Sequence, residues 1–311
     1  MDAAIGDGRL TLGDLRGSPR RRRKESRIRR LLFGAGVLSI VINVLIVLTL
    51  FDGTVDFLRS VDLSTLWSDG WFPRRNQFDI RTIVAGTLLV SAIAMVVAAP
   101  LGLGAAMYLS EYASPRSRRA LKPILEVLAG IPSVVMGFFA LTWISPNIMQ
   151  RFWDATAFNV GAAGIGVGIL ITPLVASVAE DAMFAVPRSL REAAYGLGAK
   201  RRHTTTRIVF PAAVSGIVAA LILGLSRAIG ETLVVAIAAG GTGGSLFSLD
   251  PTQPGQTMTA AMTALATKSD QVKKTSEAFP SLFFVSALLF LMTLSLNVVS
   301  ERFVRRVRRR Y

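Results

Sequence analysis

Six long apolar runs, separated by short polar or basic loops, constrain this chain more than any other feature. The runs cover residues 31–51, 83–109, 121–144, 160–182, 212–239 and 280–299. About 20 apolar residues in a helix are enough to cross the hydrocarbon core of a bilayer. Only helices or closed barrels satisfy their own backbone polar groups there. The pattern therefore predicts an all-α, polytopic membrane bundle of about six transmembrane helices.

The composition agrees with a membrane protein and leaves little room for a soluble domain. Hydrophobic residues make up 51% of the 311 residues, and charged residues only 18%, a balance that soluble globular domains do not show. Residues 1–30 are polar and rich in Arg, which predicts a flexible basic cytoplasmic tail. We expect residues 31–311 to form one transmembrane domain. The chain has no cysteine, which excludes disulfides and thiolate chemistry, and no pattern indicates a metal site.

The basic residues predict how the chain is oriented in the membrane. The net charge is +15, and Arg and Lys gather in both terminal segments and in the loops after the second and fourth runs. Basic loops stay on the cytoplasmic side, so both termini are expected inside, and residues 52–81, 145–159 and 240–279 outside. Because the basic residues lie in the tails and in short loops between the apolar runs, their distribution is typical of topology signals and not of a nucleic-acid-binding surface. The expected surroundings are membrane lipid, and no nucleic acid is expected as a partner.

Two local patterns inside the runs predict helix geometry. Pro100 and Pro132 interrupt the second and third runs, where the missing N–H donor and the ring are expected to kink a helix unless neighbouring groups satisfy the freed carbonyls. Gly216, Ala220 and Gly224 recur every four residues in the fifth run. They therefore share one helix face, against which another helix can pack closely.

Four charged residues lie near the predicted cytoplasmic ends of two runs. Lys122 and Glu126 are four residues apart in the third run, a spacing that predicts a pair along one helix. Glu180 and Asp181 close the fourth run, where they are expected to be hydrated or to touch the following loop.

The most specific pattern lies in the basic loop between the fourth and fifth runs. It resembles the EAA loop of ABC importer permeases, and the matching positions are Glu192, Ala193, Ala194, Gly198, Ile208 and Pro211. Phe210 stands where the family has Leu, an exchange of one apolar residue for another. Physically, the alanines give a short helix with a closely approachable face, the glycine ends it, and the proline begins the next span.

The resemblance implies that this loop, at about 183–211, couples a permease domain to a cytoplasmic ATPase. Its coupling residues would be Glu192, Ala193, Ala194, Gly198 and Pro211. The chain has no phosphate-binding loop of the Walker type. ATP and Mg²⁺ would therefore be bound by the partner ATPase, and this chain is expected to have no cofactor, no catalytic residue and no enzymatic activity of its own. The alternative is an ordinary helix-turn-helix loop.

Two charged residues lie inside the fifth run. Arg227 and Glu231 are four residues apart, which predicts that they share one helix face. Burial of an isolated charge is expensive, so the two are expected to face a cavity or each other. The planar fork of an arginine suits a tetrahedral oxyanion. The carboxylate of Glu231 would accept a hydrogen bond from protonated phosphate. Sulfate carries no such proton at neutral pH. A purely structural ion pair is the alternative.

The sequence around this pair narrows the resemblance. Residues 227–232 and 129–139 look like those of phosphate permeases, and residues 250–257 look more like the PstC-type subunit than its PstA-type sister. This resemblance implies a phosphate importer in the bacterial cytoplasmic membrane. Its partners would be a homologous PstA-type permease, two copies of the ATPase and an extracytoplasmic phosphate-binding protein.

Three other interpretations stay open at the level of sequence. The chain could be the PstA-type sister subunit, or a sulfate or molybdate permease that shares the EAA loop. In a different class, it could be a membrane channel or sensor that moves nothing by ATP hydrolysis. A channel would have no need of an EAA helix.

Overall fold

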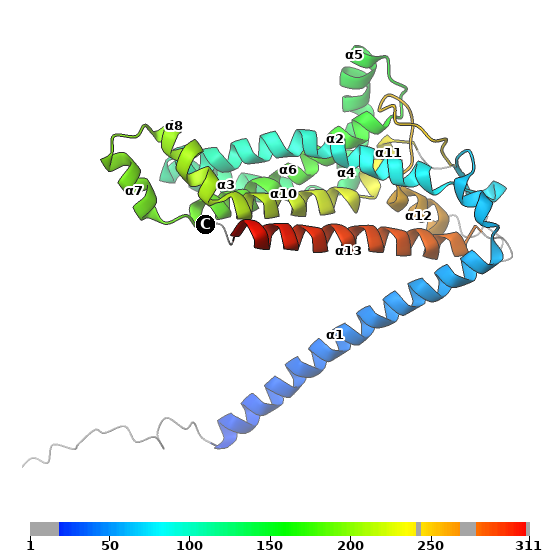
Figure 1. Cartoon of the computed structure of the whole chain (residues 1–311), viewed down its shortest axis with the longest axis horizontal. Helices are drawn as coiled ribbons and strands as arrows, with labels where there is room; N and C mark the ends of the chain where they lie inside the picture. Colours follow the sequence, from blue (N-terminus) through cyan, green and yellow to red (C-terminus); the bar gives the residue numbers. More distant parts are fainter. Residues whose placement is uncertain (1–18, 241–243, 268–277, 309–311) are drawn as a thin grey trace, which may run out of the picture. The chain divides into compact units, whose positions relative to one another are not determined.

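The computed structural model describes residues 19–240, 244–267 and 278–308, and this part of the chain is mainly helical (Figure 1). Four helices are long and apolar enough to cross a membrane, and up to six spans result if each of two bent helix pairs is counted as one. The predicted fold class, a polytopic all-α bundle, is confirmed. The single spans are Lys24–Ser60, Ile80–Tyr112, Val160–Phe184 and Pro280–Arg302.

The chain forms two compact units, Met1–Asp52 and Gly53–Tyr311. The first unit is described from Pro19, where helix α1 (Pro19–Ser60) begins. The helix thus starts inside the stretch that was predicted to be a flexible tail, and residues 1–18 of that tail lie outside the described residues. In the first unit the apolar side chains of α1 are mostly exposed, Leu31 to 73% and Phe33 to 74%, as expected of a helix in lipid.

The second unit contains three long helices, at residues 80–107, 160–184 and 280–308, together with shorter elements. Its elements are η1 (Leu63–Trp67), β1 (Trp71–Phe72), η2 (Pro73–Arg75), β2 (Gln77–Phe78), α2 (Ile80–Met107), η3 (Tyr108–Tyr112), α3 (Pro115–Ala129), α4 (Ser133–Phe139), η4 (Ala140–Gln150), α5 (Arg151–Trp153), α6 (Val160–Phe184), α7 (Arg188–Gly196), α8 (Arg201–Thr204), η5 (Thr205–Val209), α9 (Phe210–Ala212), α10 (Val214–Ile229), α11 (Leu233–Ala238), α12 (Met258–Thr267) and α13 (Pro280–Arg308). Strands β1 and β2 form a short antiparallel hairpin.

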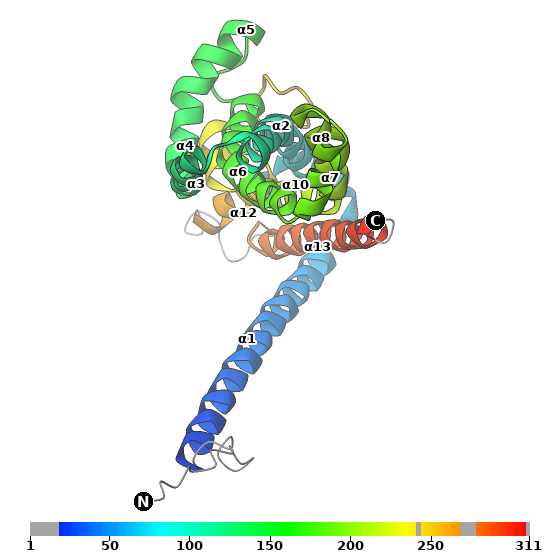
Figure 2. The same ribbon diagram turned by 90° about the vertical axis from the view of Figure 1, so that its left-hand side faces the viewer.

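Helix α6 is the centre of the bundle and packs against α2, α10 and α3 (Figure 2). Figure 1 shows α7 and α8 at one end of the bundle and α5, α11 and α12 towards the other. The C-terminal end of α13 lies at the end that carries α7. Helices α7 and α11 therefore lie towards opposite ends of the second unit.

Polar caps fix where the main helices begin. The Asn159 side chain accepts a hydrogen bond from Ala162 N at 2.7 Å at the start of α6. Asp79 caps α2 in the same way, and Ser114 caps α3 just before the proline in its first turn. These caps satisfy backbone N–H groups that have no partner within the helix.

The small face predicted in the fifth run lies against α6. A Cβ atom on Gly216 would lie 2.4 Å from Ala182 Cβ, and one on Gly224 would lie 2.6 Å from Val175 Cγ2. Ala220 between them is fully buried. The predicted close approach of a second helix is confirmed, and it leaves no room for larger side chains.

Two predicted spans are broken helices. The third run bends by 87° between α3 and α4, at the position where Pro132 predicted a kink. At Pro100, by contrast, α2 continues without a break. The fifth bends by 72° between α9 and α10, and α10 then ends at Ile229 before α11 resumes at Leu233. The prediction that Arg227 and Glu231 share one continuous helix is wrong, because the helix ends between them.

Candidate functional site

The charged pair of the fifth run meets across the end of a helix. Arg227 lies in the last turn of α10, and Glu231 follows the tight turn at Gly230, where Glu231 N donates to Ala228 O at 3.1 Å. Arg227 Nη1 and Glu231 Oε2 are 2.8 Å apart. The predicted contact between the two charges is confirmed, although the backbone that presents them is a helix end and not a helix face.

The two partners differ strongly in exposure. The Arg227 side chain is 48% exposed, whereas that of Glu231 is 3% exposed. Among the described residues, Glu231 Oε2 accepts no hydrogen bond, so its contact with Arg227 is an ion pair whose N–H groups are not directed at the oxygen. A buried acceptor without a hydrogen bond is costly, and such atoms call for a functional explanation.

A segment that the sequence interpretation did not assign to the site is attached to Glu231. Thr259 Oγ1 donates to Glu231 O at 2.7 Å, and the hydroxyls of Thr257 and Thr259 are 3.0 Å apart. Gln256 in the same segment is 2% exposed, and its Oε1 has no hydrogen-bond partner among the described residues. The signal in the sequence was a short polar stretch directly before an apolar helix.

The loop before this segment folds back onto the bundle. Val160 N and Gly161 N at the start of α6 donate to Gln253 O and Pro251 O at 3.0 Å and 2.8 Å. Gly255 N donates to Ala239 O at 3.2 Å. The loop that resembles the PstC type therefore covers the start of α6 and leads the chain to Gln256.

The coupling loop forms the short helix α7 that its pattern predicted. Gly198 has φ +79°, a left-handed conformation that favours glycine and ends the helix. Ala199 N donates to Ala194 O at 3.0 Å across this turn. Of the predicted coupling residues, Ala194 is buried and Glu192 and Ala193 are exposed. Pro211 lies in α9, directly before the 72° bend.

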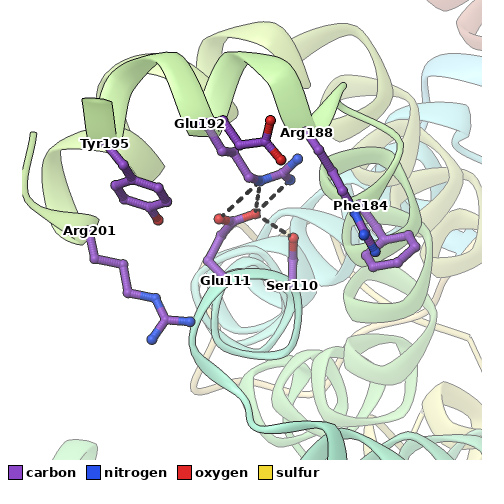
Figure 3. Close-up of a pocket in the computed structure, with 8 residues that line it drawn as sticks. Ser110, Glu111, Phe184, Arg188, Glu192, Tyr195 and Arg201 are labelled. Carbon is purple, nitrogen blue, oxygen red and sulfur yellow. Dashed lines mark hydrogen bonds and ion pairs between the residues drawn. The ribbon is translucent and has the colours of Figure 1, made fainter. Parts of the chain in front are cut away.

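Beside α7 lies a pocket of about 400 Å³ (Figure 3). Its lining residues are Ser110, Glu111, Phe184, Arg188, Arg191, Glu192, Tyr195 and Arg201. Within it the carboxylate of Glu111 is bound by Arg191, with Nη2 at 2.8 Å from Oε1. Sequence reasoning missed this pair, although Glu111 stands directly after an apolar run, where an acidic residue is unexpected.

The prediction for Lys122 is wrong. Its Nζ lies 3.0 Å from Glu180 Oε2 and 3.2 Å from Asp181 Oδ1, both on α6, and not beside Glu126. Arg118 binds the other oxygen of Glu180. Because α3 bends away from α4, its basic face meets the end of α6.

Comparison with known proteins places the chain in a family. Residues 98–311 match the binding-protein-dependent transport system inner membrane component family. The phosphate transport system permease protein PstC of Mesorhizobium japonicum is 30% identical, over 88% of each chain. PstC 1 of Mycobacterium tuberculosis is 34% identical over 73% of this chain and 72% of that protein. The probable ABC transporter permease protein YqgH of Bacillus subtilis is 35% identical over 60% of this chain and 59% of its own length.

Solved structures support the same fold. A chain of a bacterial alginate ABC transporter superposes with a TM-score of 0.64, at 17% identity over 91% of this chain and 97% of that one. A chain of the MetNI methionine ABC transporter superposes with a TM-score of 0.50 at 19% identity. The predicted resemblance to PstC-type permeases is confirmed. The chain therefore belongs to the family of binding-protein-dependent transport system inner membrane components and is a multi-pass permease subunit of an ABC importer.

Proposed function

We propose that this chain is the PstC-type permease subunit of an ATP-driven phosphate importer, and that Arg227 and Glu231 lie on the path of the phosphate ion. The observation that carries the proposal is the buried Glu231 carboxylate, with one oxygen that accepts no hydrogen bond among the described residues, beside a half-exposed Arg227. The names of the PstC relatives support phosphate as the substrate.

The chemistry of the pair suits a protonated oxyanion. The exposed guanidinium of Arg227 offers several N–H donors in one plane, which match two oxygens of a tetrahedral anion. Glu231 holds that guanidinium when no anion is present. Its second role is to accept a hydrogen bond from a P–OH group, which satisfies the buried oxygen. Sulfate has no proton at neutral pH, so it would leave this oxygen of Glu231 without a hydrogen bond. The negative charges of sulfate and of the Glu231 carboxylate would also repel each other.

The coupling helix α7 fits the proposed role in energy transfer. Leu197 at its end is 90% exposed, Leu190 is 43% exposed and Tyr195 is 44% exposed, so apolar side chains stand next to the exposed Glu192. Such a surface is suited to a protein partner. In our proposal a cytoplasmic ATPase subunit contacts α7 through Glu192, Ala193 and this apolar edge, and it holds ATP and Mg²⁺. The chain itself catalyses no reaction.

The proposed assembly contains this chain, a PstA-type permease, two ATPase subunits and an extracytoplasmic phosphate-binding protein. The end with α7 and the C-terminal end of α13 is cytoplasmic, and the loop around Gln253 is outside, where the binding protein delivers phosphate. ATP binding brings the ATPases together and opens the path outward, and hydrolysis returns it inward.

Radiolabelled phosphate uptake tests the proposal in cells that lack their own importer and produce the partner subunits. Uptake requires this chain, falls with Arg227→Gln and Glu231→Gln, and is not inhibited by sulfate. Glu126→Gln is the matched control, because Glu126 is exposed. Sulfate or molybdate uptake without phosphate uptake would disprove the substrate and keep the permease. Uptake that persists without the ATPase would favour a channel.

A further inference from the structure

The side chain of Arg191 is the centre of a compact hydrogen-bond cluster next to α7. Its Nε lies 3.2 Å from Glu111 Oε1, and its Nη2 lies 2.8 Å from the same oxygen. Its Nη1 donates to Val186 O at 2.6 Å, and Nη2 also donates to Met183 O at 2.9 Å. In Figure 3 the dashed lines meet at the Glu111 carboxylate, to which Ser110 Oγ also donates at 2.9 Å.

The cluster is shielded from water. The Glu111 side chain is 3% exposed and that of Arg191 is 16% exposed. Arginine presents its donors in a rigid planar fork, so a guanidinium held by a carboxylate and two carbonyl groups has one orientation. Burial reduces screening by water and salt, which makes the pair stronger than one on the surface. The cluster is therefore a fixed connection.

The connection joins three elements that are far apart in the sequence. Arg191 belongs to α7, Met183 lies in the last turn of α6, and Glu111 lies in η3, which continues α2. Helices α2 and α6 pack closely along the bundle. A displacement of α7 that is carried by this cluster thus acts on both of these helices at once.

Helix α7 has little other attachment to the bundle. Ala194 is the one residue of α7 that is buried. Pro187 precedes the helix, and the left-handed Gly198 follows it, so both connections to the chain are turns. Without the Arg191 cluster, α7 would be held mainly by these turns and by its contacts with α8 and η5 of the same loop, and it would rotate when a partner pushes on it.

We propose that Arg191 and Glu111 form a rigid joint that transmits the movement of α7 to α2 and α6. Both are positioning residues, and this inference rests on the proposed function as an ATP-driven importer. The surface of α7 that meets the ATPase stays intact when the joint is broken. The predicted defect is therefore uncoupling, in which ATP is hydrolysed and little substrate moves.

The first test measures substrate moved per ATP hydrolysed by the assembled complex in proteoliposomes. The variants are Arg191→Gln, Arg191→Lys and Glu111→Gln, and the control is Arg188→Gln, because Arg188 is an exposed residue of α7 that lines the same pocket. With Arg191→Gln and Glu111→Gln the ATPase copurifies as in the parent, and the transport ratio falls about tenfold, a usual size for coupling between sites. Arg191→Lys retains the charge without the fork and gives an intermediate ratio.

The second test does not depend on the substrate. Because the chain has no cysteine, Ser189→Cys places a single spin label on an exposed position of α7. In the full chain in nanodiscs, Glu111→Gln and Arg191→Gln increase the mobility of this label, and Arg188→Gln does not. A label at Trp153, at the other end of the bundle, is unaffected.

Three results would contradict the proposed joint: unchanged label mobility, an unchanged transport ratio, or loss of ATPase copurification. The last result would mean that Arg191 and Glu111 are needed for binding of the ATPase. If one variant fails to insert, the other two still decide. If the parent complex moves an anion other than phosphate, the proposed substrate fails, and the label mobility and the ratio for that anion still test the joint.

Discussion

The ammonium group of Lys122 lies 3.0 Å from Glu180 Oε2, and Arg118 binds the other oxygen of the same carboxylate. Arg118 also lies over the Phe184 ring, 4.1 Å from its centroid. Helix α3 has no buried residue of its own. The two cations therefore fix α3 to the end of α6, and Glu180 is the point at which they meet.

Loss of the Glu180 charge is expected to loosen α3. Glu180 is 1% exposed, whereas Asp181 is 66% exposed. Glu180→Gln should lower the free energy of unfolding by about 2 kcal/mol, because two charged hydrogen bonds are weakened and both cations are partly exposed. Asp181→Asn should change it by less than about 0.5 kcal/mol. Unfolding of the two variants in mild detergent measures the difference, and equal effects would show that burial of Glu180 is unimportant.

The turn after α7 is expected to require glycine for conformational reasons alone. Gly198 has φ +79°, and nothing lies within 4 Å of a Cβ placed there. Gly198→Ala should cost about 1 to 2 kcal/mol of turn stability and reduce ATPase copurification. Gly198→Asn should do less damage, because asparagine tolerates this conformation. Gly196→Ala is the control, since Gly196 has equal space but is the last residue of α7 and is not among the glycines with positive φ. If Gly196→Ala and Gly198→Ala have the same effect, the conformation of the turn is not the cause.

Close packing of α10 on α6 is expected to be sensitive to a single methyl group. Gly216→Ala places Cβ 2.4 Å from Ala182 Cβ, so the helices must move apart. Overpacking of this kind costs about 1 to 3 kcal/mol. Gly104→Ala is the control, because nothing lies within 4 Å of that position, and it should be neutral or stabilising. Thermal unfolding of the purified chain compares the two, and a neutral Gly216→Ala would mean that the interface adapts.

The sequence was sufficient to predict the spans and the short helix α7, because both depend on local properties. Hydropathy decides which segments enter a bilayer, and Gly198 ends a helix by its own conformational freedom. The partner of Lys122 was not predictable, since it depends on the bend between α3 and α4 that brings Glu180 within reach. Pro132 indicated the bend but not its size.

The environment of Glu231 was only partly predictable for the same reason. Its contact with Arg227 follows from four-residue spacing, which is retained when the helix ends between them. The contribution of Thr259 and Gln256 depends on how the loop before them folds back onto the bundle. Polar residues beside an apolar helix were the available signal, and only the fold shows that they are buried.

Substitution of Gln256 distinguishes most clearly between a role in folding and a role in transport. Its Oε1 is buried and has no hydrogen-bond partner among the described residues, so a structural argument alone predicts that Gln256→Leu is neutral or stabilising. If Gln256 accepts a hydrogen bond from the anion on the path, the same variant retains stability but loses phosphate uptake. We expect uptake to fall about tenfold, corresponding to one lost hydrogen bond of about 1.4 kcal/mol. Uptake and unfolding are measured on the same preparation, with Gln150→Leu at an exposed position as control. If uptake is unchanged and stability improves, Gln256 does not contact the anion on its path. If uptake and stability fall together, the role of Gln256 is in folding.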